Sequence, residues 1–172
     1  MLKNSRIQVF WQEHNGAGTA RNLGLAHAKG NYVLFPDADD EYNENYISRL
    51  LEAVETNDVD IAMLEDQQTH KSIKSFGHKG YFYPKNRAIP TQSISRLLTI
   101  TKNAAHNKIF KTSMIKENQL YFSETMSIND MFFTMCVLVC SKNIVFMDDC
   151  LYTIKRNRNQ FKKFCMEIQR DK

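Results

Sequence analysis

The first 64 residues alternate short apolar runs with longer segments in which apolar residues recur every three or four positions. Arg6 to Trp11 is β-branched and aromatic, which predicts a short strand. Thr19 to Gly30 has small and apolar residues at helical spacing, and Gly30 is placed to end the helix in a left-handed turn. Tyr32 to Phe35 follows as an apolar run, which is typical of a central strand buried on both faces.

The next two elements continue this alternation. Asn43 is placed to cap a second helix that ends near Thr56, and Val59 to Leu64 forms another apolar run. Strands and helices that alternate with short links predict an α/β layer with parallel neighbouring strands, and they put functional loops at the carboxyl ends of the strands. The apolar stripe of the second helix comprises Tyr46, Ile47, Leu50, Leu51 and Val54.

The rest of the chain has a looser pattern. Ser127 to Val139 predicts an apolar helix, with Ser127 or Asn129 as its N-cap and Asp130 in its first turn. The other predicted elements are helices at Thr91 to Ile100 and Thr112 to Asn118, an edge strand at Tyr81 to Tyr83, and strands at Ile144 to Met147 and Leu151 to Ile154.

The composition is that of one globular domain, because the chain has 172 residues, of which 42% are apolar and 24% are charged. No apolar run approaches the ~20 residues that span a bilayer, and the N-terminus has no signal-peptide pattern, so we expect a cytoplasmic protein. The four cysteines lack the paired spacing of a zinc ribbon, which favours reduced thiols.

The net charge of +4 is concentrated at the C-terminus. Seven basic and two acidic residues follow Ile154, whereas the rest of the chain is slightly acidic. We therefore expect a domain over residues 1–154 and a basic helical tail over residues 155–172. The tail has two interpretations, a contact with anionic lipid or phosphate and, more simply, a solvated helix face.

Three carboxylates, Asp37, Asp39 and Asp40, follow the strand at Tyr32 to Phe35. One residue separates Asp37 from Asp39, so both carboxylates can converge on a hard cation such as Mg²⁺ or Mn²⁺, while Asp40 points elsewhere and holds the loop. A divalent ion there would neutralise the charge of a nucleotide diphosphate leaving group. The alternative is a solvated acidic turn without a metal.

The loop from Asn15 to Thr19 has two glycines before a helix, which is compatible with a phosphate held by backbone N–H groups. It lacks the Lys-Ser/Thr of a P-loop and the third glycine of a dinucleotide fingerprint, so neither motif is present. A loop that uses glycine only for its backbone conformation is an equally good interpretation. The role of Asp130 is also open, since the helix dipole stabilises an acid in a first turn whatever its function.

One longer pattern bears on these alternatives. The segment reads Asn15-Gly16-x-Gly18-x-Ala20-Arg21-Asn22-x-Gly24-Leu25-x-x-Ala28-x-Gly30-x-Tyr32-Val33-x-Phe35-x-Asp37-x-Asp39-Asp40. This run resembles the central signature of the family 2 glycosyltransferases, which have the nucleotide-sugar-binding GT-A fold. Many positions match in a fixed order, which makes the resemblance far more specific than a lone DxD motif.

The resemblance implies roles for the residues at matching positions. Asp37 and Asp39 correspond to the DxD acids of the family, with Asp39 as the metal ligand and Asp37 nearer the ribose or sugar of the donor. Arg21 corresponds to an arginine near the donor, and Asn22 supports it. The resemblance also implies a divalent cofactor, Mg²⁺ or Mn²⁺.

Three later patterns resemble the family more weakly. The family has Glu-Asp at the start of a late helix; here Asn129 replaces the first acid, and Asp130 keeps the second, the general base that deprotonates the acceptor hydroxyl. His106 to Phe110 resembles a Trp-x-Lys pattern with histidine for tryptophan, which implies that Lys108 contacts the acceptor or the diphosphate. Arg156 resembles the arginine of a Tyr-x-x-Arg pattern that meets the diphosphate, and Asn129 is expected on the acceptor side.

The function that the resemblance implies is an inverting sugar transfer in bacterial surface polysaccharide synthesis. The expected donor is a nucleotide-diphosphate sugar, most simply a UDP-sugar, and the expected acceptor is a hydroxyl of a saccharide or of a lipid-linked molecule. We expect no nucleic-acid partner. The basic tail allows a peripheral contact at the inner face of the membrane.

The front of the chain departs from the family pattern. The family begins with a strand, a helix and a second strand that grip the nucleoside base, and these do not precede Met1. We therefore expect an N-terminally truncated GT-A fold, with a mostly parallel sheet, in a gene fragment or one half of a split protein. The alternative function is that of a non-catalytic fragment that binds a partner protein or a membrane through an open sheet edge and the basic tail.

Overall fold

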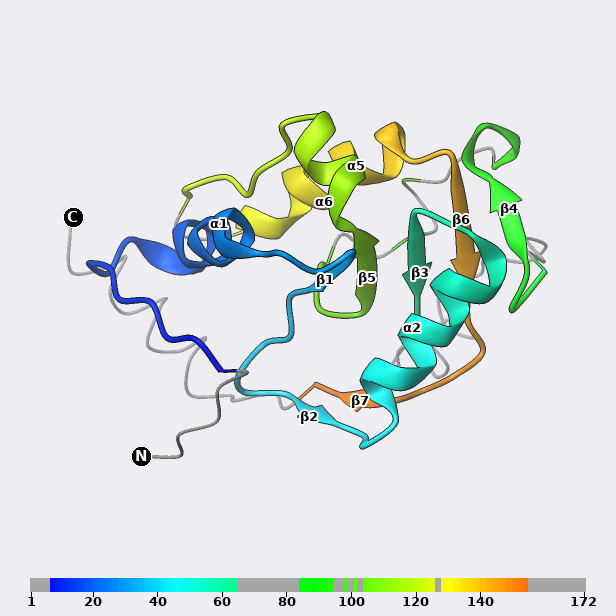
Figure 1. Ribbon diagram of the computed structural model, residues 1–172, viewed down its shortest axis with the longest axis horizontal. Coiled ribbons are helices and arrows are strands. Elements are labelled where there is room, and N and C mark those ends of the chain that lie inside the picture. The colour runs from blue at the N-terminus through cyan, green and yellow to red at the C-terminus, as the bar shows by residue number, and fades with distance from the viewer. Residues whose placement is uncertain are drawn as a thin grey trace, which may run out of the picture.

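The computed structural model describes residues 7–64, 84–94, 98, 101, 104–125 and 128–154. These residues form a five-stranded sheet in the order β1-β5-β3-β6-β4 and a separate two-stranded sheet of β2 and β7 (Figure 1). The strands are β1 (Tyr32–Leu34), β2 (Glu41–Tyr42), β3 (Ile61–Met63), β4 (Ala88–Pro90), β5 (Lys108–Lys111), β6 (Asn143–Phe146) and β7 (Tyr152–Thr153). The helices are α1 (Gly16–His27), α2 (Tyr46–Asn57), α5 (Thr112–Glu117), α6 (Asn129–Cys140) and the 3₁₀ turn η1 (Thr91–Ser93). None of these described helices is long and apolar enough to cross a membrane.

Three of the five strands in the main sheet point the same way. β3 and β6 are parallel neighbours, and β1 runs in their direction, although antiparallel β5 separates it from β3. The predicted α/β class is confirmed, but β1 and β3 are not adjacent as the sequence predicted. The hydropathy pattern missed β5, because Asn107 and Lys108 interrupt it just before the buried residues Ile109 and Phe110.

The core lies on both faces of the sheet. Successive residues of a strand face opposite sides, so Ile61 of β3 packs with the α6 side while Ala62 packs with α2. On the α2 side the sheet is covered by the buried stripe Tyr46, Leu50 and Val54. On the other side lie α6, α5 and four phenylalanines, Phe35, Phe110, Phe122 and Phe133. Figure 1 shows α2 in front of the sheet and α6 on the side away from it.

Several predicted boundaries are wrong. Residues 7–15 form neither helix nor strand, and Trp11 is 91% exposed, so the predicted strand at Arg6 to Trp11 is absent over its described part. α1 ends at His27, and the glycine with a positive φ is Gly16 at its start (φ +85°), not Gly30. β1 is an edge strand of the five-stranded sheet and is only half-buried, so the prediction of a central strand is wrong.

Other predictions are confirmed, and some lie outside the described residues. α5, α6, β6 and β7 match the predicted elements to within two or three residues. Within the described residues, Cys136, Cys140 and Cys150 form no disulfide, and each is half-buried. Ile47 is exposed and does not belong to the buried stripe of α2. The predictions at Tyr81 to Tyr83, at most of Thr91 to Ile100, at Cys165 and over the tail at 155–172 lie outside the described part of the chain.

α1 packs closely against the segment that leads into α6. The amide of Asn22 donates to the carbonyl of Phe122 at 2.9 Å and accepts from the N–H of the same residue at 2.8 Å. One turn earlier, Gly18 is buried, and a Cβ added there would meet the carbonyl oxygen of Ser123 at 2.1 Å. The two hydrogen bonds between the side-chain amide of Asn22 and the backbone of Phe122 therefore hold α1 at a distance that only glycine permits at position 18.

We expect Gly18→Ala to destabilise the protein by about 1–3 kcal/mol, because the new methyl group meets a backbone oxygen and α1 must move. The measurement is the free energy of unfolding from denaturant titration. The matched control is Gly24→Ala in the same helix, where a Cβ meets nothing within 4 Å. Gly24→Ala is expected to stabilise by about 0.5–1 kcal/mol, since alanine is the better helix former. Equal effects of the two substitutions would contradict this account of α1 packing.

Candidate active site

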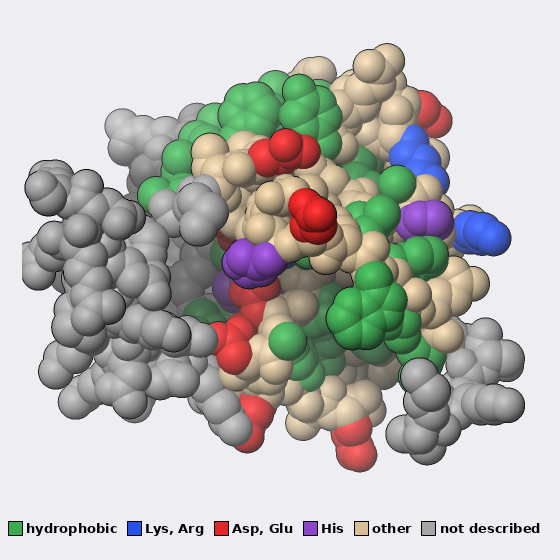
Figure 2. All heavy atoms as spheres, turned by 90° about the vertical axis from the view of Figure 1, so that its left-hand side faces the viewer, with side chains coloured by type: hydrophobic (Ala, Val, Ile, Leu, Met, Phe, Trp, Pro, Cys, Tyr) green, Lys and Arg blue, Asp and Glu red, His purple; other side chains and the backbone are tan. Residues whose placement is uncertain are grey.

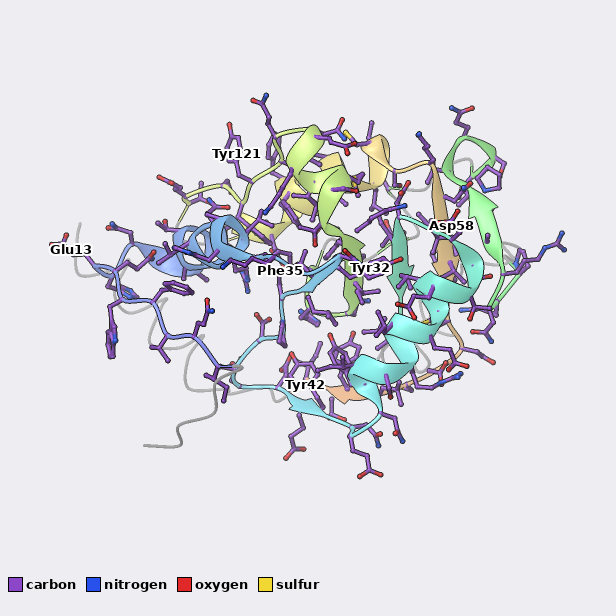
Figure 3. The ribbon with its side chains drawn as sticks, in the orientation of Figure 1. Glu13, Tyr32, Phe35, Tyr42, Asp58 and Tyr121 are labelled. Atoms are coloured by element: carbon purple, nitrogen blue, oxygen red, sulfur yellow. The ribbon has the colours of Figure 1, made fainter. Side chains whose placement is uncertain are left out.

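The site is built at the carboxyl end of β1, where Phe35 anchors the chain. Its ring packs edge-on against Phe122 at 4.8 Å and against Phe133 at 5.6 Å. Phe35 is 7% exposed, so the chain leaves the core directly after it and Asp37 comes at the rim. Figure 3 labels Phe35 where the chain leaves β1 and Tyr42 farther along the chain, on β2.

A β-turn arranges the three carboxylates. The N–H of Asp40 donates to the carbonyl of Asp37 at 3.2 Å, which brings the first and fourth residues of the turn together. Asp39 lies at the tip and is exposed. The prediction that Asp40 points elsewhere is wrong, because a carboxylate oxygen of Asp40 lies within 4.8 Å of a ligand atom of Asp37 and of His106.

Tyr42 holds this turn in place. Its hydroxyl accepts from the N–H of Asp37 at 2.7 Å and lies 3.2 Å from the carbonyl of the same residue, to which it donates. Burial raises the pKa of Tyr42 to about 12, against the lowering effect of the backbone bond, and the charge of Asp40 adds to the rise. The hydroxyl therefore keeps its proton at neutral pH and remains a donor.

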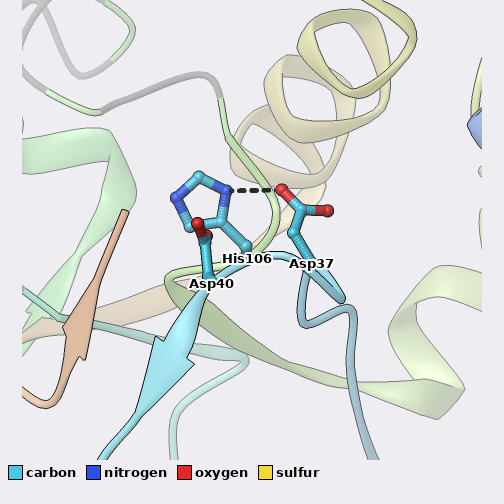
Figure 4. Close-up of side chains that lie close together, drawn as sticks. All are labelled: Asp37, Asp40 and His106. Carbon is cyan, nitrogen blue, oxygen red and sulfur yellow. Dashed lines mark ion pairs between the residues drawn. The ribbon is translucent and has the colours of Figure 1, made fainter. Parts of the chain in front are cut away.

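His106 completes a cluster with the two paired acids (Figure 4). Its Nδ1 lies 3.3 Å from Oδ2 of Asp37, and one ligand atom from each of Asp37, Asp40 and His106 falls within 4.8 Å of the others. The imidazole is 11% exposed and packs edge-on against Tyr152. Nε2 of His106 is buried without a hydrogen-bond partner among the described residues.

Figure 2 shows acidic and histidine side chains around a recess on one face of the molecule. Two carboxylates and an imidazole are a donor set that Mn²⁺ accepts and in which Mg²⁺ would use the oxygens. The histidine could not be found from the DxD spacing, because β5 brings it to the turn from about seventy positions away in the sequence.

Arg21 supplies the positive charge of the site. Nη2 donates to Oδ1 of Asp37 at 2.5 Å, and Nη1 donates to Oδ1 of Asn129 at 2.7 Å. The guanidinium carbon lies 5.4 Å from the ring centroid of Phe122, in a cation–π contact. Burial raises the pKa of the Asp37 carboxyl, but the hydrogen bonds from His106 and Arg21 and the charge of Arg21 outweigh it and hold that pKa below its usual value.

The first turn of α6 carries Asp130, as predicted. The predicted cap is wrong for Asn129, because Ile128 is the N-cap with a positive φ of 59° and Asn129 is already helical, with its side chain bonded to Arg21. Ser127 lies outside the described residues. Asn129 is 7% exposed, whereas Asp130 is half-buried at the rim.

The fold brings some of the predicted site residues together, whereas others have structural roles elsewhere. Arg21, Asp37 and Asn129 are joined by hydrogen bonds, and Asp39 and Asp130 lie on the turn and the helix that these residues connect. Asn22 contacts the backbone of Phe122 and so supports α1. Lys108 is fully buried, with its ammonium bonded to the carbonyl of Ala104 and to Asn107, so a direct contact with acceptor or diphosphate is not supported.

Arg156 lies outside the described residues.

Residues 1–119 match the family model described as glycosyl transferase family 2. The chain belongs to this family. The resemblance found in the signature from Asn15 to Asp40 is therefore confirmed by a match that covers more than half of the chain.

Known family members are similar over most of this chain. The glycosyltransferase GlyG of Streptococcus pneumoniae is 27% identical over 167 residues, which cover 91% of this chain and 54% of GlyG. The poly(ribitol-phosphate) β-N-acetylglucosaminyltransferase TarS of Staphylococcus aureus is 27% identical over 152 residues, which cover 87% of this chain and 25% of TarS. The chain thus spans about half of the first relative and a quarter of the second.

The solved structure of S. aureus TarS residues 1–349 in complex with UDP-GlcNAc matches the fold. The TM-score is 0.63 at 25% identity, over 83% of this chain and 40% of that one. The GT-A fold expected from the family resemblance is confirmed by this match.

The ion pair of Asp37 predicts an acid-dependent loss of stability. A carboxyl whose folded pKa is depressed stabilises the fold above its unfolded pKa, and this contribution disappears as pH falls through the folded value. We expect Asp37→Asn to cost about 1–2 kcal/mol at pH 7, since Arg21 loses a charged partner. The difference from wild type should shrink below about pH 4, near the ordinary pKa of aspartate.

The measurement is the free energy of unfolding of both proteins between pH 7 and pH 3. Asp39→Asn is the matched control, because Asp39 lies in the same turn but is exposed at its tip. Parallel pH profiles for wild type and Asp37→Asn would show that the ion pair does not contribute.

Proposed function

We propose that the chain is part of a glycosyltransferase that moves a sugar from a nucleotide-diphosphate sugar to a hydroxyl acceptor with inversion, in bacterial surface polysaccharide synthesis. The observation that carries the proposal is the set of hydrogen bonds by which Arg21 joins the Asp37 turn to the first turn of α6, where Asp130 lies, in a member of family 2. The domain is expected over residues 1–154, with a basic tail at 155–172.

The proposed donor is a UDP-sugar. The support is the solved TarS structure with UDP-GlcNAc, which matches the fold of this chain. Asp37, Asp39 and Asn22 remain the proposed donor-side residues, and Arg21 is the cation beside Asp37. The proposed acceptor is a saccharide or a lipid-linked hydroxyl, and the name of the relative TarS, a poly(ribitol-phosphate) β-N-acetylglucosaminyltransferase, supports a hydroxyl-bearing polymer.

The residues at the turn fit a divalent ion. Asp37, Asp40 and His106 bring three ligand atoms within 4.8 Å of one another, and the exposed carboxylate of Asp39 lies on the same turn. Mg²⁺ or Mn²⁺ held by these acids, with His106 favouring Mn²⁺, would supply charge neutralisation for a leaving diphosphate. Asp39 and Asp37 are the ligands that the family resemblance implies, and Asp40 and His106 are those that the fold adds.

Asp130 is the proposed general base. A carboxylate at the rim, in the first turn of a helix, can accept the proton of an acceptor hydroxyl while the oxygen attacks the anomeric carbon from the side opposite the diphosphate. The C–O bond to the new acceptor forms as the bond to the diphosphate breaks, so the anomeric configuration inverts. Arg156, when it lies near the diphosphate, would add a positive charge for the leaving group.

The tail and the α6 surface are the basis of the alternative function. Ile128, Phe132 and Val139 are 57–69% exposed on one side of α6, and the tail carries the excess positive charge. A fragment that binds a partner protein, or an anionic membrane at its cytoplasmic face, would use these features without chemistry. Calorimetry with UDP and Mn²⁺ separates the two functions: heat of binding supports the transferase, whereas no heat, and no rescue when the family's front strand-helix-strand segment is added, supports the binding module.

Asp130→Asn should abolish transfer and leave donor binding nearly intact. The reason is that the amide cannot accept the hydroxyl proton, whereas the charges around Asp37 are unchanged. The assay is UDP release from UDP-GlcNAc, with water and with poly(ribitol phosphate) as acceptor probes, together with calorimetry of UDP. Loss of UDP affinity equal to the loss of rate would argue against a base.

Single alanine variants of Asp39 and Asp40 identify the metal ligand. If Asp39 holds the ion, as the family resemblance implies, Asp39→Ala weakens Mn²⁺-dependent UDP binding and Asp40→Ala does not. The opposite order of effects would assign the ion to the cluster of Asp37, Asp40 and His106. UDP affinity that is independent of Mn²⁺ in the wild-type chain would contradict both assignments.

A further inference from the structure

Arg21 touches the two halves of the proposed site at once. Nη2 donates to the carboxylate of Asp37 on the turn, and Nη1 donates to the amide oxygen of Asn129 at the start of α6. The turn follows β1 and the helix lies about ninety residues later, so no local chain geometry relates them. The planar guanidinium fixes the directions of both bonds, which a lysine at this position could not do.

The surroundings of Arg21 leave it little freedom. Its side chain is 19% exposed and lies over the ring of Phe122. The side-chain amide of Asn22 forms hydrogen bonds with both the N–H and the carbonyl of Phe122. Gly18, one turn earlier on α1, leaves no room for a side chain, because a Cβ added there would lie 2.1 Å from the carbonyl oxygen of Ser123 and 3.1 Å from the Cβ of Asn129. Arg21 therefore reaches both hydrogen-bond acceptors from a helix that is itself packed against the segment leading into α6.

The hydrogen-bond acceptor that α6 offers to Arg21, the side-chain amide oxygen of Asn129, is buried and neutral. Asn129 is 7% exposed, and its backbone carbonyl also accepts from the N–H of Ser123 at 3.3 Å. Because the amide carries no charge, the guanidinium keeps Asp37 as its ion-pair partner while it orients the helix. This bond is made at the first residue of α6, directly before Asp130, so it constrains the end of the helix that carries this carboxylate.

We propose that Arg21 is a positioning residue, which acts through Asn129 to hold the Asp130 carboxylate in a fixed relation to the Asp37 turn. The role is distinct from anion binding by Arg21 and rests on the proposed function, since it concerns the base of that reaction. Arg21 would then matter for the rate of the chemical step more than for donor affinity. A 1 Å misplacement of a catalytic group is enough to cost about 100-fold in rate.

The first test is independent of activity and uses the 172-residue chain. Asp37→Asn and Asn129→Leu are made singly and together, and the free energy of unfolding is measured by denaturant titration. We expect the two effects to be non-additive, and to become additive when Arg21→Met is present in every member of the set. Additive effects with Arg21 in place would overturn the proposed link.

The second test separates positioning from mere structural support. In the UDP-release assay with UDP-GlcNAc and Mn²⁺, Asn129→Leu should lower kcat by about 100-fold with little change in the donor KM. Asn129→Asp keeps an acceptor oxygen for Arg21 and should recover most of kcat. Asn118→Leu is the control, because it removes the side-chain bond to Met114 at the end of α5 and should change stability without changing kcat.

The outcomes distinguish this proposal from the proposed function. Wild-type kcat in Asn129→Leu, or no recovery in Asn129→Asp, overturns the positioning role even if the stability effects are coupled. No UDP release by the wild-type chain, with UDP binding absent in calorimetry, overturns the proposed function and the positioning role with it. In that case coupled unfolding energies would still show that Arg21 links the turn to α6.

Discussion

The aromatic cluster of Phe35, Phe110, Phe122 and Phe133 is the interaction on which the rest of the site depends. Each ring comes from a different segment, and the stacked pair of Phe122 and Phe133 lies at 3.9 Å between centroids. Aromatic pairs of this kind add about 0.5–1.5 kcal/mol each beyond their burial. Phe35 lies two residues before Asp37, Phe133 lies three residues after Asp130, and Phe122 lies beneath the guanidinium of Arg21, so the packing that forms the core also holds the turn and α6.

The charges at the site determine which ligands it can bind. Four aspartates lie on the turn and the first turn of α6, and the guanidinium of Arg21 is paired with one of them. The pair is only partly exposed, so its attraction is stronger than that of a surface ion pair. The site therefore has a negative excess at its exposed side, which suits a cation, and a fixed positive group at its inner side.

The sequence was informative where local pattern and chemistry agree. The run from Tyr32 to Asp40 predicted a strand with acids at its carboxyl end, and the stripe of α2 was correct at Tyr46, Leu50 and Val54. It was misleading where tertiary contacts decide. β5 contains a buried lysine whose charge is met by a carbonyl and an amide, and no hydropathy pattern reveals such partners. Likewise, the DxD spacing gave no sign of the cluster that Asp37 and Asp40 form with His106, because tertiary structure brings that histidine to the turn.

Ile128, the N-cap of α6, has a left-handed backbone conformation that affects how the chain folds into the helix. A β-branched residue at a φ of 59° is strained, because its Cβ approaches the backbone, and glycine or asparagine would adopt this conformation more readily. Because β-branching disfavours this conformation in the unfolded chain as well, the native entry to α6 has to be imposed by the packing of the helix behind it. Backbone strain is thus stored two positions before Asp130, the carboxylate whose direction matters most.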